Sequence, residues 1–187
     1  GCGPFIDPVT GDLVTLNPVI TLPDVVGICE NSLPTRINAP DEVDGYRWFQ
    51  ILPSGDEVLL SEESFVDISE IGTYRYEIYD LIDQEGVIIE CSSTKEFMVI
   101  SSSIASVESV LKEEDSGLFT VTINVSGIGD YEFSLNDIDG PYGDENVFSG
   151  LEEGSYVIYI RDKKGCGTID VRVILSFPPT GFPTFFS

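Results

Sequence analysis

Histidine is absent from this 187-residue chain, and its absence excludes several kinds of site. Without histidine there is no Ser-His-Asp or Cys-His catalysis and no His-ligated zinc. Long apolar runs are absent as well, since none reaches the roughly 18–20 residues that a membrane-spanning helix needs. Positive charge is scarce: 9 basic residues stand against 33 acidic ones, a net charge of −24. Such a field repels phosphates and anionic lipids, so we expect no nucleic-acid partner and no membrane insertion.

The residues that are present favour a folded β-protein. Hydrophobic residues make up 42% of the chain and aromatic residues 11%, which is enough to pack a core. Apolar and polar residues alternate along residues 119–125, 131–135 and 171–175, with turns rich in Gly, Asp and Asn between such runs. Alternation with a period of two, bounded by such turns, is typical of antiparallel sandwiches and not of helices. The sequence therefore predicts an all-β fold.

Short polar and proline-rich stretches predict the domain boundaries. The triplet at residues 101–103 is all serine and reads as a linker between a first domain, residues 19–102, and a second, residues 103–176. Residues 177–187 are rich in Pro and Phe and cannot pair regularly in a sheet, so we expect a connector.

The first 18 residues raise a separate question. Gly1-Cys2-Gly3 repeats at residues 165–167, just before the last predicted strand. We therefore expect residues 1–18 to be the last strand of a preceding module, followed by a linker. The alternative is a lipidated N-terminal Cys2.

One pair of motifs refines the fold of the first domain. Trp48 lies in a strongly β-prone run, and Gly72-Thr73-Tyr74-Arg75-Tyr76 follows on a later predicted strand. This combination resembles the immunoglobulin-like pattern of a buried Trp and a tyrosine corner, with Tyr76 in the place of the usual second cysteine. We therefore predict two tandem immunoglobulin-like antiparallel β-sandwiches.

The four cysteines, at positions 2, 29, 91 and 166, fit no zinc or thioredoxin spacing. Disulfides in an exported protein suit them better. We predict a Cys29–Cys91 disulfide, because both residues fall within the first domain and near its opposite ends. The alternative is that both are free thiols, and the partners of Cys2 and Cys166 remain open.

Acidic residues crowd the loop at residues 136–146. Asp137, Asp139 and Asp144 offer the hard oxygen ligands that Ca²⁺ prefers, but the spacing only partly matches an EF-hand, whose twelfth-position Glu is missing. We interpret this stretch as an acidic turn and expect no metal and no other cofactor. If calcium binds anywhere, these three aspartates are the candidates.

Paired carboxylates and exposed aromatic rings are two further kinds of candidate site. Paired carboxylates perform glycosidase chemistry, but no spacing here singles out a pair, so we expect no enzyme. Tyr46, Trp48, Tyr79 and Tyr142 would form a sugar-stacking platform if they were exposed. The plainer interpretation is that Trp48 belongs to the core and that Tyr142 is a turn residue.

The last 60 residues resemble a known module. The match has three parts: residues 131–135 (YEFSL), residues 146–167 (NVFSGLEEGSYVIYIRDKKGCG) and residues 182–186 (FPTFF). Together they resemble the module that precedes the type B sorting domain of type 9 secretion substrates, the large surface proteins of the phylum Bacteroidota that include gliding-motility adhesins. Residues 137–138 are inserted relative to that pattern, Thr184 stands where Lys is usual, and the sorting domain itself is absent.

The resemblance implies a function and a location. It implies a non-catalytic stalk or adhesion module, exported by the type 9 secretion system and attached at the cell surface. Its partners would be neighbouring modules of the same chain and, through a docking tail of Phe182, Phe185 and Phe186, the secretion or motility machinery. The alternative function is a carbohydrate- or calcium-dependent binding module that accompanies a secreted enzyme.

Overall fold

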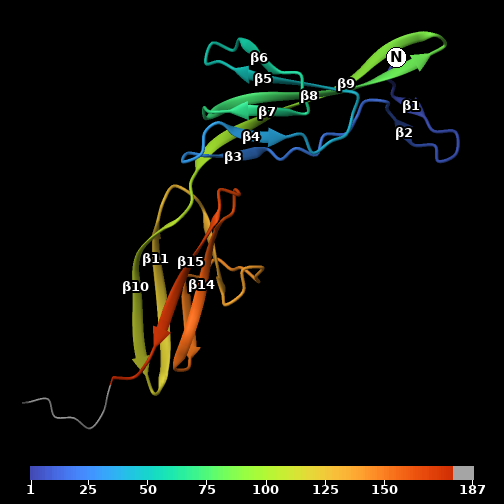
Figure 1. Cartoon of the computed structure of the whole chain (residues 1–187). Coiled ribbons are helices and arrows are strands. Elements are labelled where there is room, and N and C mark those ends of the chain that lie inside the picture. Colours follow the sequence, from blue (N-terminus) through green and yellow to red (C-terminus); the bar gives the residue numbers. More distant parts are fainter. Residues whose placement is uncertain (179–187) are drawn as a thin grey trace, which may run out of the picture. The chain divides into compact units, whose positions relative to one another are not determined.

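The computed structural model describes residues 1–178, and its regular elements are fifteen β-strands (Figure 1). The described range contains no helix, and hence no helix suited to crossing a membrane. The chain divides into two compact units, Gly1–Ser101 and Ser102–Ser187, called unit 1 and unit 2 below. The all-β class predicted from the alternation is confirmed.

Unit 1 contains a five-stranded sheet in the order β3–β9–β8–β5–β6 and a two-stranded sheet of β4 and β7. The strands of the larger sheet are β3 (Val25–Cys29), β9 (Val87–Ser102), β8 (Gly72–Gln84), β5 (Gly45–Ile51) and β6 (Glu57–Ser61). Those of the smaller sheet are β4 (Thr35–Asn38) and β7 (Phe65–Ile68). Ile37, Val66 and Ile68 of the smaller sheet share one core with Trp48 and Tyr76 of the larger sheet. Unit 1 is therefore a two-layer sandwich.

The alternation along β8 explains how this core is filled. Tyr74, Tyr76 and Ile78 point inward and are buried, while Arg75 and Glu77 lie between them on the other face. Trp48 is only 1% exposed, and its ring centroid lies 4.4 Å from that of Tyr76. The core position predicted for Trp48 is confirmed. Tyr76 supplies the ring that packs against the Trp where an immunoglobulin domain would have its disulfide.

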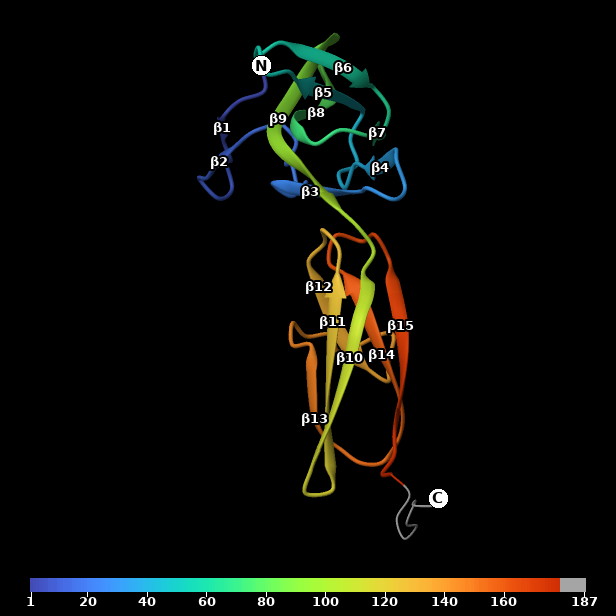
Figure 2. The ribbon, with the colours of Figure 1, turned by 90° about the vertical axis from the view of Figure 1, so that its left-hand side faces the viewer.

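Unit 2 consists of two three-stranded sheets (Figure 2). One sheet has the order β10–β11–β13, with β10 (Ser106–Asp115), β11 (Leu118–Ser126) and β13 (Val147–Leu151). The other has the order β12–β14–β15, with β12 (Tyr131–Leu135), β14 (Gly154–Asp162) and β15 (Thr168–Leu175). Val121 and Ile123 of the first sheet share a core with Ile158, Ile160 and Val173 of the second.

A tyrosine corner occurs in each unit. In unit 1 the Tyr74 hydroxyl donates to the Glu70 carbonyl over 2.7 Å, and in unit 2 the Tyr156 hydroxyl donates to the Glu152 carbonyl over 2.7 Å. Both tyrosines end the same local pattern, Glu-x-Gly-Thr/Ser-Tyr, at residues 70–74 and 152–156. Each lies near the start of the first strand of its unit's last hairpin. A tyrosine bonded to the backbone a few residues upstream is a hallmark of immunoglobulin-like sandwiches.

The N-terminal segment differs from its prediction. The strands β1 (Phe5–Ile6) and β2 (Leu13–Val14) pair with each other as a small antiparallel hairpin. The turn between them is closed by the Asp7 amide, which donates to the Asp12 carbonyl over 2.8 Å. Residues 1–18 belong to unit 1 rather than forming a separate strand and linker, because a disulfide from Cys2 ties them to β9.

Candidate interaction surfaces

The most distinctive feature of unit 1 is the far end of the β8–β9 hairpin. Strand β8 pairs with β5 only from Thr73 to Tyr79, whereas it pairs with β9 along its whole length to Gln84. The hairpin therefore extends beyond β5, and the N-terminal segment lies against this extension. The Gln84 side-chain amide donates to the Gly1 carbonyl over 2.8 Å, and Cys2 forms a disulfide with Cys91 across a Cα–Cα distance of 5.6 Å.

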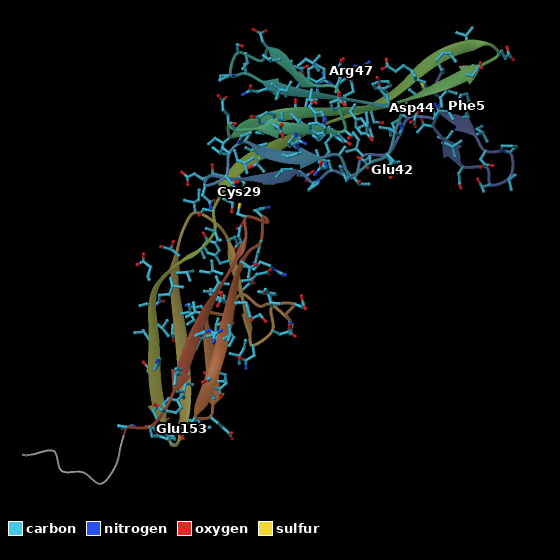
Figure 3. All side chains as sticks on the ribbon, in the orientation of Figure 1. Phe5, Cys29, Glu42, Asp44, Arg47 and Glu153 are labelled. Atoms are coloured by element: carbon cyan, nitrogen blue, oxygen red, sulfur yellow. A yellow bond between two sulfur atoms is a disulfide. The ribbon has the colours of Figure 1, made fainter. Side chains whose placement is uncertain are left out.

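This disulfide corrects the predicted Cys29–Cys91 pairing. Cys91 is fully buried on β9, and the sulfur that reaches it comes from Cys2. Cys29, at the end of β3, is disulfide-bonded in its own right, as is Cys166, so the alternative of free thiols is wrong as well. Figure 3 shows Cys29 and Phe5 at opposite ends of unit 1. Spacing alone cannot give connectivity, because four cysteines allow three pairings.

The Cys2–Cys91 bond changes how unit 1 is connected covalently. Cys91 lies in β9, and this strand continues without interruption to Ser102. The bond spans a sequence separation of 89 residues, so nearly all of unit 1 lies inside one covalent loop. A loop of that size stabilises the fold by about 4–5 kcal/mol in the chain-entropy account. We call this arrangement the covalent clamp.

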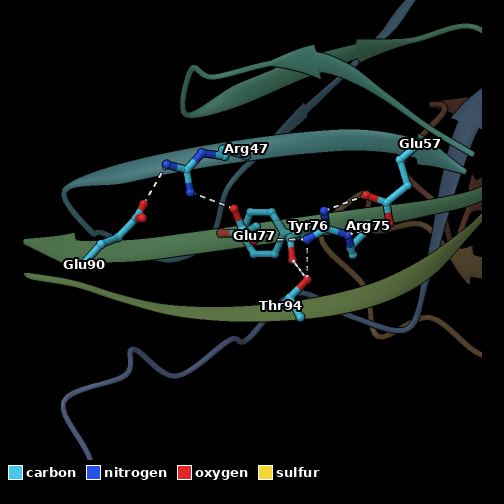
Figure 4. Close-up of polar contacts among 7 residues, drawn as sticks. All are labelled: Arg47, Glu57, Arg75, Tyr76, Glu77, Glu90 and Thr94. Carbon is cyan, nitrogen blue, oxygen red and sulfur yellow. Dashed lines mark hydrogen bonds and ion pairs between the residues drawn. The ribbon is translucent and has the colours of Figure 1, made fainter. Parts of the chain in front are cut away.

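A row of charges covers the outer face of the larger sheet (Figure 4). Arg47 pairs with Glu77 over 2.7 Å and with Glu90 over 2.6 Å. Arg75 pairs with Glu57 over 2.7 Å and with Glu77 over 3.1 Å, so Glu77 bridges the two arginines. Strands β5, β6, β8 and β9 each contribute to this charge ladder.

The charges of the ladder are paired with one another. The hydrogen bonds with Glu77 and Glu90 raise the pKa of Arg47, and those with Glu57 and Glu77 raise the pKa of Arg75. In return, the hydrogen bond from Arg75 lowers the pKa of Glu57. Each guanidinium meets two carboxylates, so its charge is already satisfied within the sheet. We interpret the ladder as a device that fixes the sheet face rather than as a ligand site.

Arginine side chains cover several aromatic rings at the surface. Arg47 lies over the Tyr79 ring at 4.3 Å, and Arg75 lies over the Phe49 ring at 4.1 Å. In unit 2, Arg161 lies over the Tyr142 ring at 3.7 Å. Tyr46 is half-buried, and its hydroxyl donates to the Asp41 carbonyl. With Trp48 in the core, the four rings considered for sugar stacking do not form a shared exposed platform.

The acidic loop at residues 136–146 does not gather its aspartates into a metal site. An Asp137 carboxylate oxygen accepts the Asp139 amide over 2.9 Å, which stabilises the turn itself. Asp144 forms an ion pair with Lys163 over 2.5 Å. Within residues 1–178 there is no group of three or more potential ligands placed to hold an ion. That this loop is an acidic turn without a metal stays a prediction.

The predicted docking tail falls at the edge of the structure. Phe182, Phe185 and Phe186 lie outside the described residues. Phe177 is described: its ring centroid lies 5.0 Å from that of Phe119, and its amide donates to the Glu153 carboxylate over 3.0 Å. The start of the C-terminal segment is thus held against unit 2.

Comparisons with known proteins give only distant structural likenesses. No family model matches the chain, and no curated protein is similar in sequence. Among solved structures, the amphioxus IgVJ-C2 molecule has 11% identity and a TM-score of 0.36, covering 80% of this chain and 100% of its own. The CD2-binding domain of CD58 has 9% identity and a TM-score of 0.38, covering 83% and 97%. A Parabacteroides merdae β-glucuronidase has 9% identity and a TM-score of 0.26, with 81% of this chain matching 23% of that one. Likenesses this distant carry no functional argument.

Proposed function

We propose that this chain is a non-catalytic stalk and adhesion module of a large cell-surface protein, built from two tandem immunoglobulin-like sandwiches. The observation that carries the proposal is the covalent clamp. Tension that enters near Cys2 passes through the Cys2–Cys91 bond directly to β9, which leads to the end of unit 1 at Ser101. The residues in the covalent loop therefore need not unravel for unit 1 to bear the load.

The repeated tyrosine corner supports the tandem arrangement. Each unit has a Glu-x-Gly-Thr/Ser-Tyr corner at the start of its last hairpin. The same immunoglobulin-like feature therefore occurs in both units. Such modules are assembled in series when a protein needs length, and their cores remain independent of one another.

Two observations support an exported location. None of the four cysteines is a free thiol, and disulfides persist in oxidising compartments outside the cytosol. The resemblance of residues 131–186 to the module before a type B sorting domain supports export through the type 9 secretion system and attachment at the cell surface. On this proposal the partners are neighbouring modules of the same chain and, through the C-terminal Phe residues, the secretion or gliding-motility machinery.

The alternative is a carbohydrate- or calcium-dependent binding module, and the surface contacts favour it less. A sugar platform needs open ring faces, but Arg47 and Arg161 lie on the rings of Tyr79 and Tyr142. A calcium site needs several oxygens converging on one point, but Asp144 is already paired with Lys163.

A shear experiment tests the stalk proposal. Cells that display the parent surface protein with Cys2→Ser and Cys91→Ser should detach at lower shear stress than cells with the parent sequence, because unit 1 loses its clamp. The matched control is Ser54→Ala, a change on an exposed turn that leaves both cysteines in place. Surface levels are compared with an antibody. Equal detachment at equal surface level would contradict the load-bearing role, and binding to a glycan array would support the alternative.

A further inference from the structure

A pocket of about 360 Å³ lies in unit 2 beside the acidic loop. Most of its wall is apolar, and it comes from three neighbouring segments: Phe133 and Leu135 of β12, Pro141 and Tyr142 of the loop, and Val147 and Phe148 of β13. Gly143 and Glu145 complete the lining. A volume above roughly 300 Å³ is enough to receive a large side chain. We call this feature the loop pocket.

The loop that forms one wall is held in place by its own hydrogen bonds. Phe133 and Gly143 exchange backbone hydrogen bonds of 2.8 and 2.9 Å, which joins the loop to β12. The Tyr142 hydroxyl donates to the Ile138 carbonyl over 2.6 Å, and Arg161 packs on the ring of the same tyrosine. The pocket is therefore formed before any partner arrives, so a partner need not meet the entropic cost of ordering this loop.

The charges around the loop pocket are negative and only partly neutralised. Asp144 is paired with Lys163, whereas the ion pairs within residues 1–178 do not include Glu145, Asp137 or Asp139. Glu145 is exposed and lines the pocket itself. A partner with positive charge is attracted to such a rim, whereas a second copy of a chain with net charge −24 is repelled.

A free strand edge borders the same pocket. Strand β13 is the terminal strand of its sheet, paired with β11 on one side only (Figure 2). The unpaired backbone groups of an edge strand can accept an added strand, and side chains of that strand then alternate into the adjoining pocket. An extended peptide fits this geometry better than a compact small molecule does.

We propose that the loop pocket receives a bulky apolar side chain from an extended basic protein segment that adds to the free edge of β13. The apolar residue enters between Phe133, Leu135 and Val147, and flanking Lys or Arg residues pair with Glu145 and its acidic neighbours. This interaction surface is independent of the covalent clamp, which lies in unit 1. The segment belongs to a different protein or module, because the nine basic residues of this chain lie in the strands of its two units or in the turn at residues 163–164.

Three synthetic peptides test the proposal by NMR titration of the intact chain. The first is Lys-Thr-Phe-Thr-Lys, the second has Ser in place of Phe, and the third has Gln in place of both Lys residues. The first peptide at millimolar concentration should shift the methyl signals of Leu135 and Val147 and leave that of Ile78, in the core of unit 1, unchanged. Loss of the Phe should weaken binding about tenfold or more. Loss of both Lys residues should weaken it about fivefold at low salt.

Two variants with the same charge change locate the site. Glu145→Lys should weaken binding of the first peptide about fivefold, whereas Glu113→Lys, on the exposed strand β10, should change it by less than about twofold. The proposal is overturned if no Leu135 or Val147 shift appears, if the Ser or Gln peptide binds as well as the first, or if both variants weaken binding equally. Equal effects of the two variants would indicate a nonspecific response to total charge.

Discussion

The last hairpins of the two units start alike and end differently. Both begin with a tyrosine corner, but β8 and β9 have 13 and 16 residues, whereas β14 and β15 have 9 and 8. The additional length in unit 1 extends beyond β5 and carries Cys91 to the place where Cys2 meets it. Unit 1 thus combines a longer hairpin and a long covalent loop with the same kind of corner that begins the last hairpin of unit 2.

The two cores differ in a second way. Unit 1 fills its core with rings that carry polar groups: the Trp48 indole donates to the Glu63 carbonyl over 3.0 Å, and the Tyr76 hydroxyl donates to the buried Asp41 carboxylate over 3.1 Å. The fully buried positions of unit 2 are mostly aliphatic, including Ile123, Ile158 and Ile160. Unit 2 buries its polar side chains apart from these aliphatic positions: the Ser102 hydroxyl donates to the buried Asp162 carboxylate over 2.7 Å. Burying a polar group costs free energy unless it finds a partner, so each unit depends on its own buried hydrogen bonds.

Among single substitutions, the largest loss of unfolding free energy is expected when a buried aromatic ring is removed from one of these cores. Trp48→Ala in unit 1 should lower the free energy of unfolding by about 3–5 kcal/mol, because it removes a large buried ring and leaves a cavity. Phe133→Ala is the matched change in unit 2. Its cost in free energy of unfolding should reach the upper end of that range only if the walls of the loop pocket, which Phe133 lines, do not relax into the space that the ring leaves. Urea denaturation followed by circular dichroism measures both. A loss below 1 kcal/mol for Trp48→Ala would contradict its central packing role.

Alkaline pH should affect unit 1 through Tyr76. Desolvation, followed by the charge of Asp41, raises the pKa of this buried hydroxyl. Because the folded pKa lies above the unfolded one, the stabilisation is complete below the unfolded pKa of about 10 and is lost as pH rises toward the folded value. The slope for one such group is about 1.4 kcal/mol per pH unit.

Trp48 is the only tryptophan of the chain, so its fluorescence in urea reports this loss in unit 1. Tyr76→Phe should make the decline above pH 10 shallower, and Tyr156→Phe in unit 2 serves as the control. An unchanged slope in the Tyr76 variant would assign the alkaline sensitivity to another group.

The tyrosine corners should differ in strength. Tyr74→Phe should destabilise unit 1 by about 1–2 kcal/mol, since the Tyr74 ring is buried and the Glu70 carbonyl loses its donor. Tyr156→Phe should cost less, about 0.5–1 kcal/mol, because its hydrogen bond to Glu152 is exposed to water. Thermal or urea unfolding of the two variants makes the comparison, and the reverse order would contradict it.

The smallest expected effect concerns the charge ladder. Glu77→Gln should destabilise unit 1 by about 0.5–1 kcal/mol at low salt, because Glu77 pairs with both Arg47 and Arg75 and its side chain is mostly buried. The difference should shrink at high salt as the remaining charges are screened. Glu30→Gln, at an exposed position of the same unit, is the control. A larger loss at high salt than at low salt would contradict the electrostatic account.

Much of the fold could be predicted because local patterns determine it. The alternation at residues 119–125 corresponds to β11, and the Trp48 and Tyr74 motifs identified the core and corner of unit 1. The second corner, at Tyr156, has the same pattern and was available in the sequence. The Cys2–Cys91 pairing was not available, because it depends on how far β8 and β9 extend beyond β5. Likewise, the arginines that cover Tyr79 and Tyr142 come from segments distant in the sequence, which no local pattern reveals.

The covalent clamp is tested most directly by stretching unit 1 within the whole chain. Force handles at Gly1 and at the exposed Ile100, attached without cysteine chemistry, bracket the disulfide. With Cys2 joined to Cys91, only the nine residues from 91 to 100 can extend, about 30 Å at full stretch. In the Cys2→Ser, Cys91→Ser variant the 27 residues from 2 to 29, which precede the remaining disulfide at Cys29, are released, and unit 1 should extend by at least about 90 Å. Equal extension of the two proteins would contradict the clamp.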